Sequence, residues 1–459
     1  MPRPKPKPPR TGREAALRAL YDVDVKAAYA NLALDHHLSG SGLEGRERAL
    51  ATELAYGVTR RRATLDWAIG QVASRPLEKT DPWVRNILRE AVYQILYMDR
   101  IPPAAAVDQA VELAKQYGHA GVAKFVNGVL RNLLRQLPEL QWPDEAADPV
   151  RALAVKFSYP EWLVAQWLER FGPDETVRLL EAGNQVPPLT VRVNRLKATR
   201  EEAAAALAAE GVRTEPTRHS PQGLVIQDLT SASSLDRLQA MKQGLITVQD
   251  ESSMLVAAVV NPQPGWTVID LAAAPGGKST HLAELMGNQG RVIAVDVHPH
   301  KVDLIEDSAR RLGTTIVEGV CLDARQVGDA MPERADAVLC DLPCSGLGTL
   351  ARRPDARWRK NPEDVATLVP LQRAILESAA KALKPGGVLV YSTCTVQKAE
   401  NQELVESFVA DHPEFRFDNI WAYLPETISR EGQAEGYVQL LPHVHGTDGF
   451  FIARMVKKG

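Results

Sequence analysis

From residue 244 onward, short apolar runs alternate with longer amphipathic segments, and this alternation restricts the chain to very few folds. Apolar runs bounded by glycine or proline indicate buried strands of a parallel sheet, and the segments between them indicate crossover helices. We therefore predict a doubly wound α/β sheet. The expected strands are residues 267–271, 291–296, 315–319, 335–341 and 387–392, the expected helices are 278–286, 301–312, 362–383 and 401–411, and residues 437–441 and 450–456 form a closing antiparallel pair.

Two of the predicted strands are each followed by a cysteine. Asp341-Leu-Pro-Cys344 closes the strand at 335–341, and Tyr391-Ser-Thr-Cys394 closes the strand at 387–392. Open α/β sheets bind their ligands at the carboxyl ends of the strands. Two thiols at this edge leave four explanations open, which are core packing, a metal site, a disulfide and a catalytic pair.

The other cysteines weigh against two of these explanations. They are Cys321 and Cys340, none of the four lies in the first 320 residues, and no CxxC motif occurs. This pattern argues against a disulfide framework or a structural zinc site, and it favours a reducing, cytoplasmic setting. The histidine pairs at 298/300 and 443/445 have no third ligand at metal spacing, so no metal site is predicted.

Composition and charge indicate a soluble protein with a polyanionic partner. The chain is 45% apolar and 24% charged, and the apolar run 254–260 is far too short to span a bilayer. Residues 1–10 are basic with no apolar segment behind them, so we expect a disordered basic arm and no secretory signal. Residues 1–140 hold 21 Lys+Arg against 15 Asp+Glu, whereas residues 141–459 hold 33 against 42. A basic front on an acidic body suggests a polyanion at the front.

The front of the chain, residues 11–140, is predicted to be all-helical. Apolar residues recur at helical spacing, and Asp81-Pro82 and Pro102-Pro103 separate the helices. The segments Gly12–Tyr21, Leu88–Tyr93, Ala110–Lys115 and Phe125–Arg131 resemble the NusB family of RNA-binding helical domains. The resemblance implies a helical bundle that contacts RNA.

Residues 141–243 are predicted to be a linker followed by a small α/β subdomain. Prolines interrupt the pattern, and short helices are expected at 162–170 and 174–182. Strands are expected at 189–193 and 223–227, with Thr199 capping a helix at 200–210. This part resembles the RNA-recognition-like insert of RNA cytosine methyltransferases. Residues 244–459 then form the catalytic domain.

The loop Asp270-Leu-Ala-Ala-Ala-Pro-Gly-Gly-Lys278 stands between the first predicted strand of that domain and its helix. Small residues allow close approach of a ligand to the backbone, and a helix N-terminus favours anionic groups. A dinucleotide fingerprint is excluded because G-x-G-x-x-G is absent, and a P-loop is excluded because position 272 is alanine. Asp296 ends the second strand, where an acid binds ribose hydroxyls, and Asp323 follows the third strand, where an acid suits an adenine amino group.

The thiol at position 344 favours chemistry at carbon. Methyltransferases of exocyclic amines carry Asn/Asp-Pro-Pro and an aromatic residue at this place, whereas here a cysteine replaces the aromatic residue. C5 of cytosine becomes nucleophilic only after a thiolate adds to C6. Such a reaction needs one nucleophilic cysteine and benefits from a second group near C5.

Pro343-Cys344, Thr393-Cys394 and the loop at 270–278 together resemble the RsmB (Sun/Fmu) family of ribosomal RNA cytosine-C5 methyltransferases. The resemblance implies a seven-stranded, Rossmann-like methyltransferase domain that uses S-adenosyl-L-methionine. It also implies that Cys394 is the nucleophile and that Cys344 assists release, an order that spacing alone leaves open. Asp341 and Lys278 are expected to act beside them. The residues expected to bind the cofactor are Ala272, Ala273, Ala274, Pro275, Gly276, Gly277, Lys278, Asp296, Asp323 and Asp341.

The stretch 352–360 has five cations and a tryptophan beside the proposed active site, a composition that suits RNA backbone and stacking contacts. The predicted RNA-binding residues are Arg352, Arg353, Arg357, Arg359 and Lys360. We therefore predict methylation of C5 of a cytosine in 16S ribosomal RNA through a covalent adduct at C6. Two alternatives stay open, which are the same chemistry on transfer RNA and a non-catalytic NusB-like RNA-binding factor.

Overall fold

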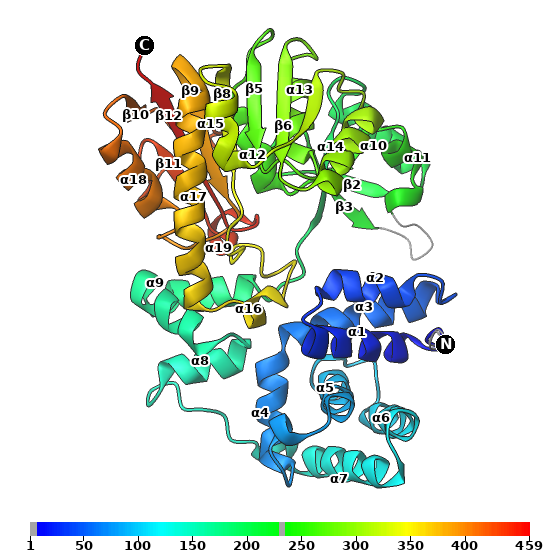
Figure 1. The fold of residues 1–459 in the computed structure, drawn as a ribbon. Helices are drawn as coiled ribbons and strands as arrows, with labels where there is room; N and C mark the ends of the chain where they lie inside the picture. Colours follow the sequence, from blue (N-terminus) through cyan, green and yellow to red (C-terminus); the bar gives the residue numbers. More distant parts are fainter. Residues whose placement is uncertain (1–6, 229–234) are drawn as a thin grey trace, which may run out of the picture. The chain divides into compact units, whose positions relative to one another are not determined.

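The computed structural model describes residues 7–228 and 235–459, which form two compact units (Figure 1). The first unit holds the chain up to Gln185 together with Leu350–Arg359, and the second holds Val186–Thr349 and Lys360–Gly459. Residues 1–6 of the predicted basic arm lie outside the described residues. None of the helices in the described parts of the chain is long and apolar enough to cross a membrane.

The first unit is entirely helical, as the sequence predicts. Its helices are α1 (Gly12–Lys26), α2 (Ala30–Leu38), α3 (Gly45–Arg60), α4 (Arg62–Val72), α5 (Pro82–Tyr97), α6 (Pro103–Tyr117), α7 (Ala120–Gln136), α8 (Pro149–Phe157), α9 (Glu161–Ala182) and α16 (Ala356–Arg359). Asp81 caps α5 by accepting from Trp83 N, and proline follows at the first helical position, where its missing N–H costs nothing. Helix α9 is broken at Gly172, where φ is 76°, so the two helices expected here meet at a kink. Helices α8 and α9, which the sequence analysis places in a linker, belong to this unit.

The second unit begins with a small four-stranded antiparallel sheet. Its strands are β1 (Leu189–Val193), β2 (Arg213–Pro216), β3 (Gly223–Asp228) and β4 (Ile246–Val248), in the order β2-β3-β1-β4. Helices α10 (Arg200–Ala209) and α11 (Gln239–Lys242) accompany them. Thr199 and Glu202 form a reciprocal capping box at the start of α10. The predicted cap and helix are therefore confirmed.

The main sheet has eight strands in the order β10-β12-β9-β8-β5-β6-β7, with β11 also paired to β12. They are β5 (Thr267–Leu271), β6 (Arg291–Asp296), β7 (Val317–Cys321), β8 (Ala335–Asp341), β9 (Leu383–Thr393), β10 (Phe415–Phe417), β11 (Tyr437–Leu440) and β12 (Phe450–Lys457). Strands β5 to β9 run parallel, and β12 pairs antiparallel with β9. The strand beyond the seven expected is the three-residue β10, which is too short to leave a periodic pattern.

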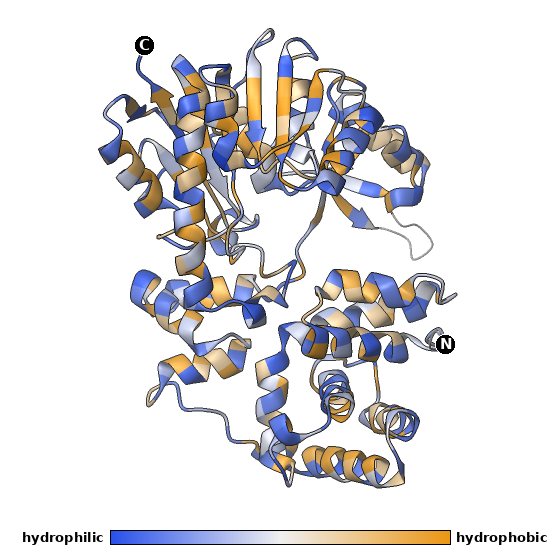
Figure 2. Ribbon diagram, viewed as in Figure 1, coloured by the Kyte–Doolittle hydropathy of each residue, from blue (hydrophilic) through white to orange (hydrophobic). Residues whose placement is uncertain are grey.

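Helices cover both faces of this sheet, which gives the doubly wound fold expected from the sequence (Figure 1). One face packs against α12 (Glu251–Val260), α13 (Gly277–Leu285) and α14 (Pro299–Leu312), and the other against α15 (Val327–Ala330), α17 (Pro362–Ala382) and α18 (Gln402–Asp411). Successive residues of β8 alternate between the two cores, with Leu339 in one and Cys340 in the other. Figure 2 shows the hydrophobic colour along β5 and β6, whereas the surrounding helices carry both colours.

The third parallel strand lies two residues later than the sequence predicts. The apolar residues Ile316 and Val317 favour a strand at 315–319, but β7 runs from Val317 to Cys321. It is the edge strand of the sheet, and none of its residues is fully buried. An exposed edge strand lacks the apolar pattern that marks the ends of a buried strand.

Candidate active site

The loop between β5 and α13 forms one wall of the site. Its backbone is left-handed at Ala272 (φ 57°) and at Gly276 (φ 95°). A Cβ atom on Gly276 would lie 3.2 Å from the Cα of Ile305, so glycine is required there both for its conformation and for space. Helix α13 starts at the next residue, which points its free N–H groups toward the loop.

A cavity of about 300 Å³ opens beside this loop. Three kinds of residue share its lining, which are residues of the loop, residues at the ends of β8 and β9, and residues around β4 and β12. The lining residues are Val248, Gln249, Asp250, Ser252, Ser253, Asp270, Ala273, Ala274, Pro275, Gly277, Lys278, Asp341, Leu342, Thr349, Cys394, Asp448 and Phe450. Six of the predicted cofactor residues therefore lie on one cavity together with the predicted nucleophile.

The two cysteines expected to act together are adjacent. Their sulfur atoms are 3.4 Å apart, a non-bonded distance at which one thiol can donate to the other. Only Cys394 lines the cavity. The hydrogen bond with Cys394, then burial, then the charges of Cys394 and Glu400 raise the pKa of Cys344 well above its ordinary value. Cys344 therefore stays a thiol, and its S–H group is available to the sulfur of Cys394.

Lys278 and Asp341, which both line the cavity, form an ion pair. Lys278 Nζ donates to Asp341 Oδ2 over 2.7 Å, and Ser392 Oγ donates to Asp341 Oδ1 over 2.8 Å. Burial lowers the pKa of the Lys278 ammonium, but the charge and hydrogen bond of Asp341 outweigh it and raise the pKa above its ordinary value. The ammonium is therefore a fixed positive charge at this site.

Asp270 is a carboxylate of the site that the predicted residue set omits. Its side chain is fully buried, and Ser279 Oγ donates to Oδ2, whereas Oδ1 has no hydrogen-bond partner. Asp270 is among the residues that line the cavity. Burial raises the pKa of the Asp270 carboxyl to about 7, and the Asp341 charge adds to the rise while the Ser279 bond opposes it. A buried oxygen without a partner, on the wall of a cavity, is suited to a ligand's ammonium group.

Two further predicted cofactor residues lie on the neighbouring strand ends. Asp296 ends β6, is 5% exposed and accepts from His298 N. Asp323 lies two residues beyond β7 and pairs with Arg325 over 2.6 Å, which holds the pKa of the Asp323 carboxyl below its ordinary value. Both are at the carboxyl edge of the sheet, but neither lines the cavity.

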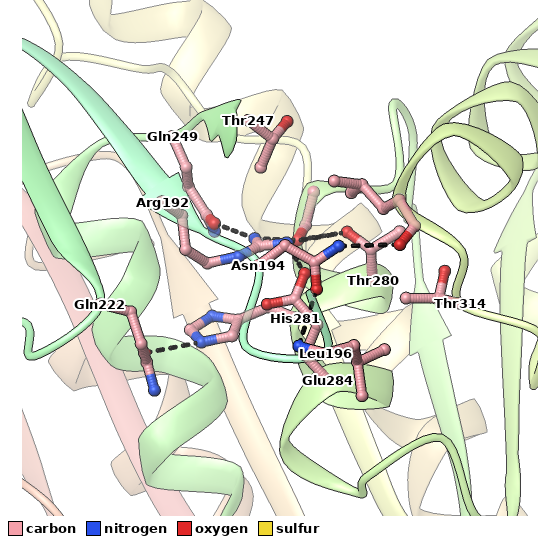
Figure 3. Close-up of polar contacts among 12 residues, drawn as sticks. Arg192, Asn194, Leu196, Gln222, Thr247, Gln249, Thr280, His281, Glu284 and Thr314 are labelled. Atoms are coloured by element: carbon pink, nitrogen blue, oxygen red, sulfur yellow. Dashed lines mark hydrogen bonds and ion pairs between the residues drawn. The ribbon is translucent and has the colours of Figure 1, made fainter. Parts of the chain in front are cut away.

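A buried arginine of the small sheet supports the start of α13, next to the loop that follows β5 (Figure 3). Arg192, on β1, is fully buried and donates from Nη1 to the carbonyl of Gly277 over 2.7 Å and to Gln249. Its Nη2 donates to Thr280 Oγ1 and to Glu284 Oε1 over 3.1 and 2.7 Å. The small sheet is thereby tied to the first turns of α13 and to a residue of the cavity wall. An isolated arginine in a short strand gives no sequence signal for this role.

The prediction that Arg357 contacts RNA is wrong in this structure. Its side chain is completely buried in the first unit and stacks 3.9 Å from the ring centroid of Tyr159. Its guanidinium donates to the backbone carbonyls of Ser158 and Gly183 and to Asn184 Oδ1, at 2.9 to 3.1 Å. Those carbonyls end α8 and α9, and carbonyls at helix C-termini attract cations. Burial lowers the pKa of the guanidinium to about 10.

The other cations of this segment keep more solvent contact. Arg353 is exposed, and Arg352, Arg359 and Lys360 are partly exposed. Arg359 lies 4.1 Å above the ring of Tyr29 in the first unit. The segment is therefore both an anchor in the first unit and a surface with exposed and partly exposed cations, and the sequence pattern indicates only the second property.

Three family models match the chain. The model for the 16S rRNA methyltransferase RsmB/F matches residues 257–456, the NusB family model matches residues 10–135, and the RsmF/B-like ferredoxin-like domain matches residues 159–232.

Relatives extend over nearly the whole chain. The probable ribosomal RNA small subunit methyltransferase B of Bacillus subtilis is 42% identical over 97% of this chain and 99% of its own. The ribosomal RNA small subunit methyltransferase B of Sodalis glossinidius is 35% identical over 91% of each. The crystal structure of PH0851 superposes with a TM-score of 0.81 at 31% identity, covering 98% of this chain and 99% of that chain. NSun6 from Pyrococcus horikoshii with SFG covers 65% of this chain and 98% of that chain, with a TM-score of 0.58 at 25% identity.

Proposed function

Because the chain belongs to the RsmB/F family of 16S ribosomal RNA methyltransferases, we propose that it methylates C5 of a cytosine in small-subunit ribosomal RNA. The observation that carries the proposal is the common cavity of Cys394, Lys278, Asp341 and the loop before α13. This cavity brings together a cysteine thiol, an ammonium group and a loop of small residues, and this combination supports the proposal.

The methyl donor is proposed to be S-adenosyl-L-methionine. The free Oδ1 of Asp270 matches a cationic amino group, and the backbone of residues 273–277 offers a close approach to the donor. Asp296 and Asp323, at the adjacent strand ends, would hold the ribose and the adenine. When bound, this group supplies the methyl group that the cytosine receives.

Cys394 is proposed to start the reaction. Its thiolate forms a bond to C6, and the electrons of the C5=C6 double bond then make C5 able to accept a methyl group. Negative charge develops on the ring in this step. Asp341 would accept from the 4-amino group or hold a proton at N3, and Lys278 beside it balances the charge.

Cys344 is proposed to assist the last step. A base takes the proton from C5, the electrons of that bond re-form C5=C6, and the bond between C6 and the Cys394 sulfur breaks with its electron pair returning to sulfur. The protonated Cys344 thiol, 3.4 Å from that sulfur, would donate a hydrogen bond to the departing thiolate.

The experiment that tests the proposal is nucleoside analysis of RNA treated with the full chain and methyl-labelled S-adenosyl-L-methionine. Deproteinised 16S ribosomal RNA and bulk transfer RNA are compared in parallel. We expect label in 5-methylcytidine from the ribosomal RNA. Label in transfer RNA alone would favour the alternative substrate, and failure to bind the methyl donor would favour a non-catalytic RNA-binding factor, as the NusB-like front suggests.

A further inference from the structure

Two adjacent buried polar residues, Glu400 and Asn401, lie behind the cysteines and have no part in the mechanism above. They precede α18 and are 0% and 1% exposed. A buried carboxylate is costly unless its oxygens accept hydrogen bonds. The partners of these two residues therefore indicate what the pair does.

Glu400 holds both residues that flank Cys344. Its Oε1 accepts from Ser345 N over 2.8 Å and from Gln372 Nε2 over 3.0 Å, and its Oε2 accepts from Ser345 Oγ. Gln372 Nε2 also donates to the carbonyl of Pro343 over 2.9 Å. One carboxylate thus fixes the backbone on either side of the first cysteine, directly at Ser345 and through Gln372 at Pro343.

Asn401 holds both residues that flank Cys394. Its Oδ1 accepts from Thr393 Oγ1 over 2.5 Å, and its Nδ2 donates to the carbonyl of Thr395 over 3.0 Å. Gln439 accepts from the same Nδ2 over 2.9 Å, and its own amide also donates to the Thr395 carbonyl. The carboxamide therefore does for the second cysteine what the carboxylate does for the first.

The two halves of this arrangement are joined. Ser345 Oγ lies 2.7 Å from Thr395 Oγ1, so the residues that follow the two cysteines contact each other. The backbone N–H of Gly348 donates to the carbonyl of Cys394 over 3.0 Å. Ser345 and Thr395 are both buried, so water does not compete for the hydrogen bond between them.

We propose that Glu400 and Asn401 are positioning residues, and that each of them positions one of the two cysteines. Glu400 acts through Cys344 on release of the adduct, and Asn401 acts through Cys394 on its formation. The inference rests on the proposed function, because it assigns each residue to one of the two covalent steps.

The test measures both steps in single-turnover reactions of the full chain with 16S ribosomal RNA and S-adenosyl-L-methionine, following the covalent protein–RNA adduct on denaturing gels. Glu400→Gln keeps the shape of the side chain but removes its negative charge and replaces one acceptor oxygen by a donor, so Ser345 Oγ can no longer donate to that atom. We expect adduct breakdown to slow by about 10-fold while formation stays within about 3-fold of wild type. Asn401→Ala should do the opposite, with formation slowed by about 10-fold.

Two comparisons separate positioning from a general structural effect. Glu403→Gln, an exposed neighbour at the start of α18, should leave both rates unchanged. Glu400→Gln added to Cys344→Ala should cause no further accumulation of adduct, since the two changes act on one group. The inference is overturned if both variants slow the same step, if neither slows any, or if the double variant shows additive effects.

Ser345→Ala tests the role of Glu400 if the Glu400→Gln variant does not fold. Ser345→Ala removes only one donor to Glu400 and one bridge to Thr395, and it should slow breakdown by about 3-fold. Unchanged breakdown in that variant would overturn the inference. If Cys344→Ala accumulates adduct and Glu400→Gln does not, only this inference fails. If no variant forms an adduct, the proposed function fails with it.

Discussion

Cys344 and Cys394 lie just beyond the ends of two neighbouring strands, β8 and β9, but their surroundings differ. Cys394 lines the cavity that also holds Lys278 and Asp341, whereas Cys344 does not and is backed by Glu400. The chain after Cys394 continues within the second unit, whereas the chain soon after Cys344 enters the first unit over residues 350–359. This difference in surroundings is the basis for proposing different roles for two cysteines at one edge of the sheet.

The largest expected effect tests the cavity side of this comparison. Cys394→Ala should lower methyl transfer by at least about 10³-fold, because it removes the nucleophile. Binding of S-adenosyl-L-methionine, measured by calorimetry, should stay within about 2-fold of wild type. Cys321→Ala, which changes an exposed cysteine, is the control and should keep full activity. Residual methylation above one tenth of wild type would contradict the proposal that Cys394 is the nucleophile.

The segment that follows Cys344 gives a test of stability. Arg357→Gln leaves several buried carbonyls of the first unit without donors, so we expect the free energy of unfolding to fall by about 3 kcal/mol. Arg353→Gln changes an exposed arginine four residues earlier and should alter it by less than about 0.5 kcal/mol. Urea titrations followed by circular dichroism measure both. Equal stabilities would contradict the anchoring role of Arg357, and weaker RNA binding by Arg353→Gln alone would support its predicted RNA contact.

Strand β8 carries a lysine–aspartate pair near each end, which provides a matched test. Lys278 pairs with Asp341 over 2.7 Å at the cavity, and Lys384 pairs with Asp336 over 2.6 Å at the opposite end. Lys278→Met should reduce kcat by about 10²-fold, because the developing charge loses its cation. Lys384→Met should leave kcat unchanged and affect stability by at most about 1 kcal/mol. Similar losses of kcat in both variants would show that the pair at the cavity has no special role.

The smallest effect concerns pH and the donor. The pKa of Asp270 is raised to about 7, so its carboxyl is mostly neutral at pH 6 and mostly ionised at pH 8. If the ionised form binds the donor's ammonium, affinity should weaken by about 10-fold one pH unit below 7 and level off above it. Calorimetry at pH 6, 7 and 8 measures this dependence, and Asp270→Asn should abolish it. An affinity that rises toward low pH would contradict the assignment of Asp270.

Sequence patterns predict the architecture well because most strands are buried on both faces. Strands β5, β6 and β8 lie where the apolar runs predict them, whereas the exposed edge strand β7 is displaced. The resemblance to the RsmB family and to NusB is confirmed by the family models and by the full-length relatives. The loop between β5 and α13 shares one cavity with Cys394 because strand ends meet at one edge of a parallel sheet.

Sequence patterns do not predict the residues that support the site through hydrogen bonds. Arg192 and Glu400 act through carbonyls and amides that are distant in the chain, and single polar residues carry no periodic signal. The sequence does not show that Arg357 is buried, because a run of cations has the same residue pattern whether all of them are exposed or one is buried. Asp270 belongs to a recognisable motif, but its free oxygen is visible only in three dimensions.

The most direct test of the account is to identify the cysteine that bonds to the RNA. A 16S ribosomal RNA in which cytidine is replaced by 5-fluorocytidine forms an adduct that cannot resolve, since fluorine takes the place of the proton that must leave C5. The full wild-type chain is incubated with this RNA and S-adenosyl-L-methionine, digested, and mapped by mass spectrometry. We predict that the RNA-bearing peptide contains Cys394. An adduct on Cys344, or no adduct while the normal RNA is methylated, would contradict it.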